Sequence, residues 1–320
     1  MSVEPVADGH SLMPLVPNKR NLRKTIARQK YLILMVITFV VWVIIFRYVP
    51  LWGWLMAFQD YKPWKSITDQ QWVGLKQFIE LFKDVDFYRS MRNTLAMSFL
   101  GLAFGFPIPI MLALLINEIK HPRFKRTVQT ISYLPHFVSW VVIASIVFRV
   151  LSPLGIVNEV LIRLGIIDNA IAFMGEPAYF WWIVVFTDLW KEMGWNSIVY
   201  LAAMAGVSPE LHEAAIIDGA GRFKRMWYVT IPGIMPTIVV LLVLSIGNII
   251  NIGFERQFLL RTASTRDVAD VIDLYILNYG IGTGRFSFGT AAGVFKSVVS
   301  LSLLSIANWL SRRTTGYKVI

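Results

Sequence analysis

The 320-residue sequence contains no cysteine and only four histidines. The absence of cysteine excludes a disulfide scaffold and thiolate-ligated zinc or iron–sulfur sites, and the histidines show no metal-ligand spacing. The sequence also lacks a G-x-x-x-x-G-K-[ST] phosphate loop, an H-E-x-x-H motif and a G-x-S-x-G motif. We therefore expect no catalytic site, no metal and no cofactor in this chain.

Charge is scarce as well. Charged residues make up 16% of the chain and hydrophobic residues 56%, and the mean hydropathy is +0.57, whereas soluble domains carry roughly 25% charged residues. So little polar surface cannot cover this apolar content in water. The first 30 residues are polar, and no small-residue cleavage site follows the first apolar run, so a cleaved signal peptide is not expected.

Long runs with few charges predict an all-α membrane protein with six transmembrane helices. Each run approaches or exceeds the ~20 apolar residues needed to cross ~30 Å of hydrocarbon. The predicted spans are Tyr31–Phe46 continuing past Arg47 to Gln59, Asn93–Asn117, Thr127–Phe148, Pro177–Pro209, Met226–Phe254 and Phe286–Ser311.

The net charge of +11 is distributed according to this topology. The two tails (1–30 and 312–320) and the loops 118–128 and 205–233 hold 16 Lys and Arg against 6 Asp and Glu, whereas the opposite segments hold 11 against 12. The positive-inside rule then places both termini in the cytoplasm of a plasma (inner) membrane protein, with a six-span transmembrane domain over 31–311. This distribution removes the support for nucleic-acid binding and leaves membrane lipid as the expected surroundings.

Two external segments predict short amphipathic helices at the outer interface. In the first, Trp72, Leu75, Ile79 and Phe82 recur at helical spacing beside charged residues. The second, 152–178, is less regular and is interrupted by proline and glycine.

The cytoplasmic loop 208–232 predicts a helix–turn–helix. Ser208 is a suitable N-cap and Pro209 a suitable first helical residue, so a short helix is expected to about Asp218. Gly219 and Gly221 can supply positive φ angles in a tight turn before the chain becomes helical again. A compact, charged element of this kind fits a docking surface.

Within this loop, Glu213-Ala214-Ala215, Gly219 and the terminal Val229-Thr-Ile-Pro232 resemble the EAA loop of ABC importer permeases. The resemblance implies that Glu213, Ala214, Ala215, Asp218 and Gly219 belong to a coupling helix that seats in a groove of the partner ATPase.

Further segments resemble the permeases that import complex oligosaccharides, including uronic-acid polymers such as pectin and alginate fragments. They are 48–65, 72–82, 133–140 and 194–205. The resemblance implies a type I ABC importer permease fold and a second homologous permease as partner. It also implies an extracytoplasmic sugar-binding protein and an ATPase dimer, which would bind the ATP and Mg²⁺.

The fourth predicted span carries three charges, Asp188, Lys191 and Glu192, that share one helix face. Each would cost about 2.5–3.5 kcal/mol at the bilayer centre, so they should face away from lipid. Two interpretations stay open, an internal Asp188–Lys191 bridge and a polar wall of a translocation pathway. In the second, Trp195 and Asn196 would stack on sugars and bond to them.

Other polar groups in the spans have similar alternatives. Asn248 and Asn251 would line the pathway or hydrogen-bond neighbouring helices. His136 is expected to be packed and hydrogen-bonded, and Arg47, Arg149 and Lys296 to extend toward the interface.

Two other classes of function remain open at this point. A secondary transporter driven by an ion gradient would use Asp188 and Glu192 as ion sites. A membrane-embedded enzyme would use the same acids with His136 as general acid and base.

Overall fold

A computed structural model describes residues 27–314, which divide into two units, one ending at Trp54 and one beginning at Leu55. The predicted N-terminal tail falls mostly outside the described residues, as does the predicted C-terminal tail beyond Thr314. The described residues are almost entirely helical, with one two-stranded antiparallel ribbon that pairs Gln59 with Trp72 and Asp60 with Gln71.

The first unit contains a long apolar helix. Its parts are α2 (Lys30–Val43), the π-helical turn η1 (Ile44–Tyr48) and the start of the 3₁₀ segment η2 (Val49–Phe58). Together they form a candidate span of 29 residues, Lys30–Phe58, in which 0% of the most apolar stretch is buried. Helix α2 is apolar on every face, as expected of a helix surrounded by lipid or by another protein.

The second unit contains the remaining elements. They are β1 (Gln59–Asp60), β2 (Gln71–Trp72), α3 (Lys76–Leu81), α4 (Val85–Gly105), α5 (Pro107–Asn117), α6 (Pro122–Tyr133), η3 (Leu134–Phe137), α7 (Trp140–Val150), α8 (Ile156–Arg163), η4 (Phe173–Gly175), α9 (Pro177–Ala205), α10 (Pro209–Ile217), α11 (Arg222–Arg225), η5 (Met226–Thr230), α12 (Ile231–Gly247), α13 (Glu255–Leu260), α14 (Arg266–Ala269), α15 (Ile272–Tyr275), η6 (Ile276–Gly282) and α16 (Phe286–Thr314).

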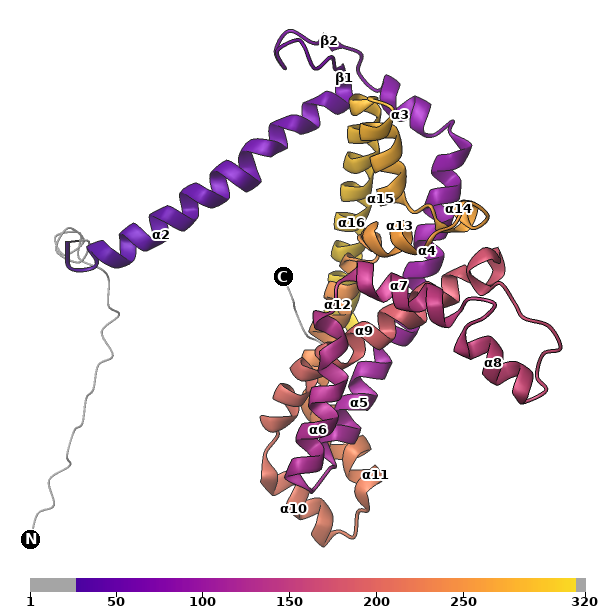
Figure 1. Cartoon of the computed structure of the whole chain (residues 1–320). Helices are drawn as coiled ribbons and strands as arrows, with labels where there is room; N and C mark the ends of the chain where they lie inside the picture. The colour runs from indigo at the N-terminus through magenta and orange to yellow at the C-terminus, as the bar shows by residue number, and fades with distance from the viewer. Residues whose placement is uncertain (1–26, 315–320) are drawn as a thin grey trace, which may run out of the picture. The chain divides into compact units, whose positions relative to one another are not determined.

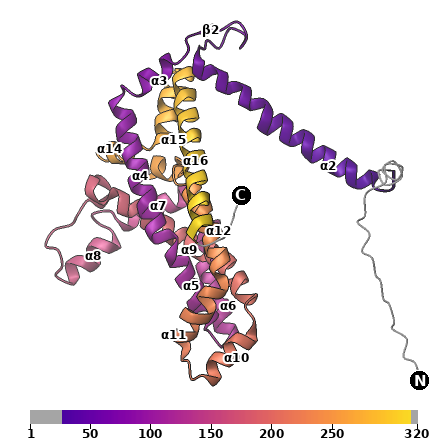
Figure 2. The same ribbon diagram turned by 180° about the vertical axis from the view of Figure 1, so that it is seen from behind.

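Helix α9 is the element around which the second unit is organised. It packs against α4, α5, α6 and α12, and also against η3, α13 and α14. Within this unit, α10 and α11 lie at one end and α3 and α15 at the other (Figures 1 and 2).

The buried side chains form three separate clusters rather than one core. One surrounds Phe180 and Val184, a second surrounds Phe87 and Tyr275, and a third surrounds Tyr200. Space for a polar cavity is therefore left between helices that would otherwise pack together.

Within residues 27–314, four helices are long and apolar enough to cross a membrane, or five if a bent pair counts as one span. Besides Lys30–Phe58 they are Val85–Asn117, Arg222–Gly247 and Phe286–Arg313, and the bent pair is Pro122–Phe137 with Trp140–Val150. The structure is thus an all-α membrane protein. Helix α9 has 29 residues and is long enough to span. It is not among these four helices because it carries three charged residues close together.

Several predicted boundaries were wrong. The predicted third span, Thr127–Phe148, is a helix pair bent by 102° rather than one continuous helix. The predicted fifth span ends at Gly247 instead of Phe254, and the amphipathic segment 72–82 contains only the six-residue α3, because Gln71–Trp72 pairs as a strand. The last helix continues to Thr314, three residues past the predicted Ser311.

Polar ties hold the α3–α15 end together. The Tyr279 hydroxyl donates to Asp86 at 2.7 Å, and this hydrogen bond, with burial, raises the pKa of Tyr279 to about 12. Lys296 pairs with Asp273 in a site where both side chains are less than a fifth exposed. Lys296 therefore does not extend to the interface as expected, because it finds a carboxylate within the protein.

Gly194 is required where α9 crosses α6. A Cβ built at Gly194 would overlap the carbonyl oxygen of Ser132, whereas one built at Gly293 meets nothing within 4 Å. We expect Gly194→Ala to cost about 1–3 kcal/mol, the usual cost of overpacking, and to lower the melting temperature of the detergent-solubilised protein. Gly293→Ala is the matched control, and equal melting of the two variants would show that the crossing tolerates a methyl group.

Candidate functional site

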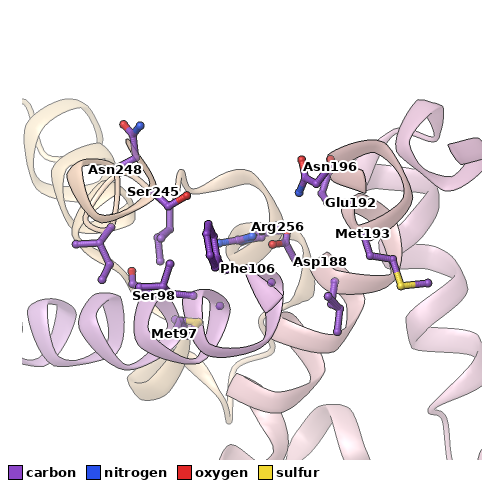
Figure 3. Close-up of a pocket in the computed structure, with 16 residues that line it drawn as sticks. Met97, Ser98, Phe106, Asp188, Glu192, Met193, Asn196, Ser245, Asn248 and Arg256 are labelled. Atoms are coloured by element: carbon purple, nitrogen blue, oxygen red, sulfur yellow. Dashed lines mark ion pairs between the residues drawn. The ribbon is translucent and has the colours of Figure 1, made fainter. Parts of the chain in front are cut away.

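A cavity of about 280 Å³ lies among α4, α9, α12 and the start of α13 (Figure 3). We call it cavity A. Its polar wall contains charged, amide and hydroxyl side chains: Asp188, Glu192, Asn196, Asn248, Ser98, Ser245 and Arg256. Gly101 and Gly105 of α4 also line it, and a Cβ on either would meet nothing within 4 Å, so their small size leaves the space open.

Asp188 is paired with an arginine from a distant part of the chain. Arg256 Nη1 lies 2.5 Å from Asp188 Oδ1, and the two side chains are 16% and 31% exposed. The expected alternative of an internal Asp188–Lys191 bridge is not among the ion pairs of the described residues. Lys191 instead lies 3.6 Å from Oε1 of its neighbour Glu192 and also binds backbone carbonyls.

Lys191 holds the break between η3 and α7. Its residue exposure is 6%, and its ammonium donates to the carbonyls of Pro135 (3.4 Å), His136 and Val138 (3.0 Å). A helix bent this sharply leaves carbonyls without intrahelical donors, and one buried ammonium binds those of His136 and Val138 as well as that of Pro135, which also accepts from the Val138 N–H at 3.1 Å. The charge of Lys191 thus compensates for backbone that departs from the helix.

Glu192 pairs with a side chain of η3 at the same break. His136 Nδ1 lies 2.7 Å from Glu192 Oε2, and the His136 ring stacks on Trp195 with centroids 4.3 Å apart and planes 2° apart. As the sequence predicted, His136 is packed and hydrogen-bonded. The stacking covers one face of the Trp195 ring.

The predicted pathway residues divide into two groups. Asp188, Glu192, Asn196 and Asn248 come together at cavity A, while the ammonium of Lys191 and the ring of Trp195 are engaged at the helix break. Asn251 is not a lining residue of this cavity, and its amide donates to Ser300 of α16 at 3.0 Å.

Arg256 was missed by sequence reasoning. It lies just past Phe254, where the fifth span was expected to end, and it was therefore interpreted as one of several charges in an external loop. The available signal was the uncompensated Asp188 in a span, which requires a cation from another helix. Several arginines could provide this cation, and the sequence alone does not show that Arg256 is the one that pairs with Asp188.

The 208–232 loop has the predicted geometry at most positions. Ser208 caps α10 by accepting from the backbone N–H of Glu210 at 3.3 Å, and α10 ends where Gly219 adopts φ +76°. Gly221 does not need a positive φ as expected, since it has φ −67° and serves as the N-cap of α11.

This loop exposes apolar side chains at the end of the unit. Helix α10 has no buried residue, and Ile217 and Phe223 are 86% and 81% exposed, with Trp227 and Tyr228 exposed beside them. Exposed apolar groups gathered on a short helical hairpin are typical of a protein contact surface.

Residues 105–316 match the family described as "Binding-protein-dependent transport system inner membrane component". The chain belongs to this family, and it is therefore a multi-pass inner membrane permease of a binding-protein-dependent ABC importer, a non-catalytic subunit for which no cofactor is expected. The membership confirms the resemblance drawn from the EAA-like loop.

Individual relatives are close. The polygalacturonan/rhamnogalacturonan transport system permease protein YteP of Bacillus subtilis (strain 168) is 45% identical over 296 residues, which is 92% of this chain and 91% of that protein. The arabinooligosaccharides transport system permease protein AraP of the same organism is 28% identical, over 82% of this chain and 83% of that protein.

Among solved structures, the chain is similar to one in the crystal structure of a bacterial alginate ABC transporter in complex with an alginate pentasaccharide-bound periplasmic protein. The TM-score is 0.84 at 42% identity, covering 93% of this chain and 100% of that chain. At this identity the fold as a whole is shared.

Replacing Lys191 tests its role at the helix break. Lys191→Met keeps much of the side-chain volume but removes the ammonium donor from the carbonyls of His136 and Val138, and each buried acceptor left unpaired costs about 1–3 kcal/mol. We expect a lower melting temperature in detergent, with a loss of at least about 2 kcal/mol. The control is Lys83→Met at an exposed lysine, and similar melting of the two variants would contradict the role.

Proposed function

We propose that this permease imports acidic oligosaccharides of the pectin and alginate class. The observation that carries the proposal is cavity A, a polar space between membrane helices in which a guanidinium stands beside amides and hydroxyls. Such groups bind sugar hydroxyls and carboxylates. The names of the similar permease and of the similar transporter structure support the same substrate class.

The proposed membrane topology has six spans, with α9 as the fourth and both termini in the cytoplasm. Helix α9 has the length to cross, since 29 residues at 1.5 Å per residue exceed ~30 Å. Its charges are compatible with a span because they are compensated inside the protein. Arg256 neutralises Asp188, and backbone carbonyls at the break between η3 and α7 bind Lys191. The permease domain then covers 31–311, with tails 1–30 and 312–320.

In this topology α10 faces the cytoplasm and serves as the coupling helix. Glu213, Ala214, Ala215, Asp218 and Gly219 would seat in a groove of an ATPase dimer, which binds ATP and Mg²⁺. Closure of the ATPases would move α10, and the movement would pass through α11 and η5 into α12. The exposed apolar residues of the loop support a docking role for this end of the unit.

The complete importer would contain a second homologous permease and an extracytoplasmic sugar-binding protein. The similarity to a subunit of an ABC transporter crystallised with a periplasmic binding protein supports these partners. The oligosaccharide would contact Asn196 and Asn248 in cavity A, with Asp188 and Glu192 nearby. Lys191, Trp195 and Asn251 do not line cavity A and would support its lining residues.

Uptake by proteoliposomes containing the whole importer tests this function. We expect ATP-dependent accumulation of an oligogalacturonide or oligoalginate only when the binding protein is present. Uptake that follows an imposed proton or sodium gradient without ATP would replace the proposal with a secondary transporter using Asp188 and Glu192. Chemically altered sugar inside the vesicles would point to the membrane-embedded enzyme instead.

Variants of the coupling loop should separate ATP hydrolysis from transport. Glu213→Lys reverses a charge in the exposed α10, so we expect the assembled complex to hydrolyse ATP while oligosaccharide uptake falls at least about tenfold. Asp69→Lys makes the same charge reversal on an exposed loop at the other end of the unit and should leave uptake near the wild-type rate. Wild-type uptake by Glu213→Lys would remove α10 from the coupling path.

Gly219 allows a test of backbone conformation alone. A Cβ at Gly219 would meet nothing within 4 Å, but its φ is +76°, a region that β-branched residues avoid and that asparagine enters more readily. We expect Gly219→Val to uncouple hydrolysis from uptake and Gly219→Asn to retain most of the coupling. Equal uptake by the two variants would show that the left-handed turn is not needed.

A further inference from the structure

A second cavity meets cavity A at the Asp188–Arg256 ion pair. This cavity, cavity B, has a volume of about 680 Å³ and is lined by Trp140, Ile252 and residues 253–256 as well as Asp188. Asp188, Ile252 and Arg256 line both cavities. Side chains that face two spaces stand between them, so the ion pair forms part of the wall that separates A from B.

The guanidinium in this wall has unused binding capacity. Arg256 Nη1 is taken by Asp188 at 2.5 Å, but Arg256 Nε is buried and has no hydrogen-bond partner in the structure. A guanidinium carries five N–H donors in a planar fork that suits two oxygens of one carboxylate. The bond to Asp188 therefore satisfies the charge of Arg256 without filling its fork.

We propose that Arg256 is the specificity-determining residue for acidic sugars, and that Asp188 occupies it as a stand-in for the substrate carboxylate. The inference rests on the proposed import of acidic oligosaccharides. A uronate carboxylate takes the place of Asp188 on Arg256, the wall between the two cavities opens, and Asp188 pairs again once the sugar has passed.

The exchange is balanced in charge for an acidic sugar and unbalanced for a neutral one. One carboxylate replaces another on the guanidinium, and the released Asp188, whose side chain is 31% exposed, can be hydrated. A neutral sugar that separates the pair leaves a mostly buried guanidinium without a counter-charge, which is strongly unfavourable. The barrier thus discriminates by charge rather than by size.

The decisive variant removes both charges together. In Asp188→Asn with Arg256→Gln, neither charge is left unpaired, so the fold is spared the cost of an isolated buried ion. The test compares uptake of an acidic trisaccharide with uptake of its methyl ester by the reconstituted importer. The same binding protein is used throughout, so its own preference cancels when the acid-to-ester ratios of variants are compared.

We expect the acid-to-ester ratio to fall at least about tenfold in the double variant, with uptake of the ester maintained. Arg256→Lys keeps the charge but not the fork and should give an intermediate ratio. Asp188→Asn removes the competitor for Arg256 and should lower KM for the acidic sugar severalfold. A ratio within about twofold of wild type in the double variant, with acidic sugar still imported, would overturn the role of Arg256 alone.

A matched control addresses general effects of removing a buried ion pair. Lys296 and Asp273 form a comparably buried pair that lines neither cavity. The double variant Lys296→Met with Asp273→Asn should keep the wild-type acid-to-ester ratio, whatever happens to its melting temperature. A wild-type importer that does not carry the acidic sugar would instead overturn the proposed substrate class, and with it the role of Arg256.

Discussion

The arrangement of the second unit depends on one buried ammonium. Lys191 of α9 donates to the carbonyls of Pro135 and His136 in η3 and of Val138 in the break before α7, where an apolar environment offers no water to bind them. The bend of 102° is therefore stable only while α9 passes beside it. The bent pair in turn places His136 against Glu192 and Trp195, so one charge organises the wall behind cavity A.

Helix α9 carries polar groups for two separate purposes. Toward the broken helix it supplies Lys191 and Glu192, which fix the backbone, and toward cavity A it supplies Asp188 and Asn196. The three charges would be prohibitive on a helix facing lipid. They are tolerated because Asp188 pairs with Arg256 of α13, while Lys191 and Glu192 pair with each other and bind groups at the η3 turn.

Local signals predicted much of this structure. Apolar runs identified the long helices, and Ser208, Pro209 and Gly219 fixed α10 and its turn because caps and positive φ angles are set by neighbouring residues. The break at Val138–Ser139 was missed because its cause, Lys191, is remote in sequence. Arg256 was missed for the same reason, since hydrophobic periodicity describes one helix at a time and carries no information about which helices meet.

The contacts of α9 also impose an order on synthesis. The carbonyls that Lys191 binds precede it in the chain, so its ammonium can be satisfied as soon as α9 is made. Asp188, in contrast, lacks its counter-charge until Arg256 has been added after α12. Until then a carboxylate on α9 must stay hydrated or protonated, which means that α9 can settle fully into the membrane only after a helix made later than itself has arrived.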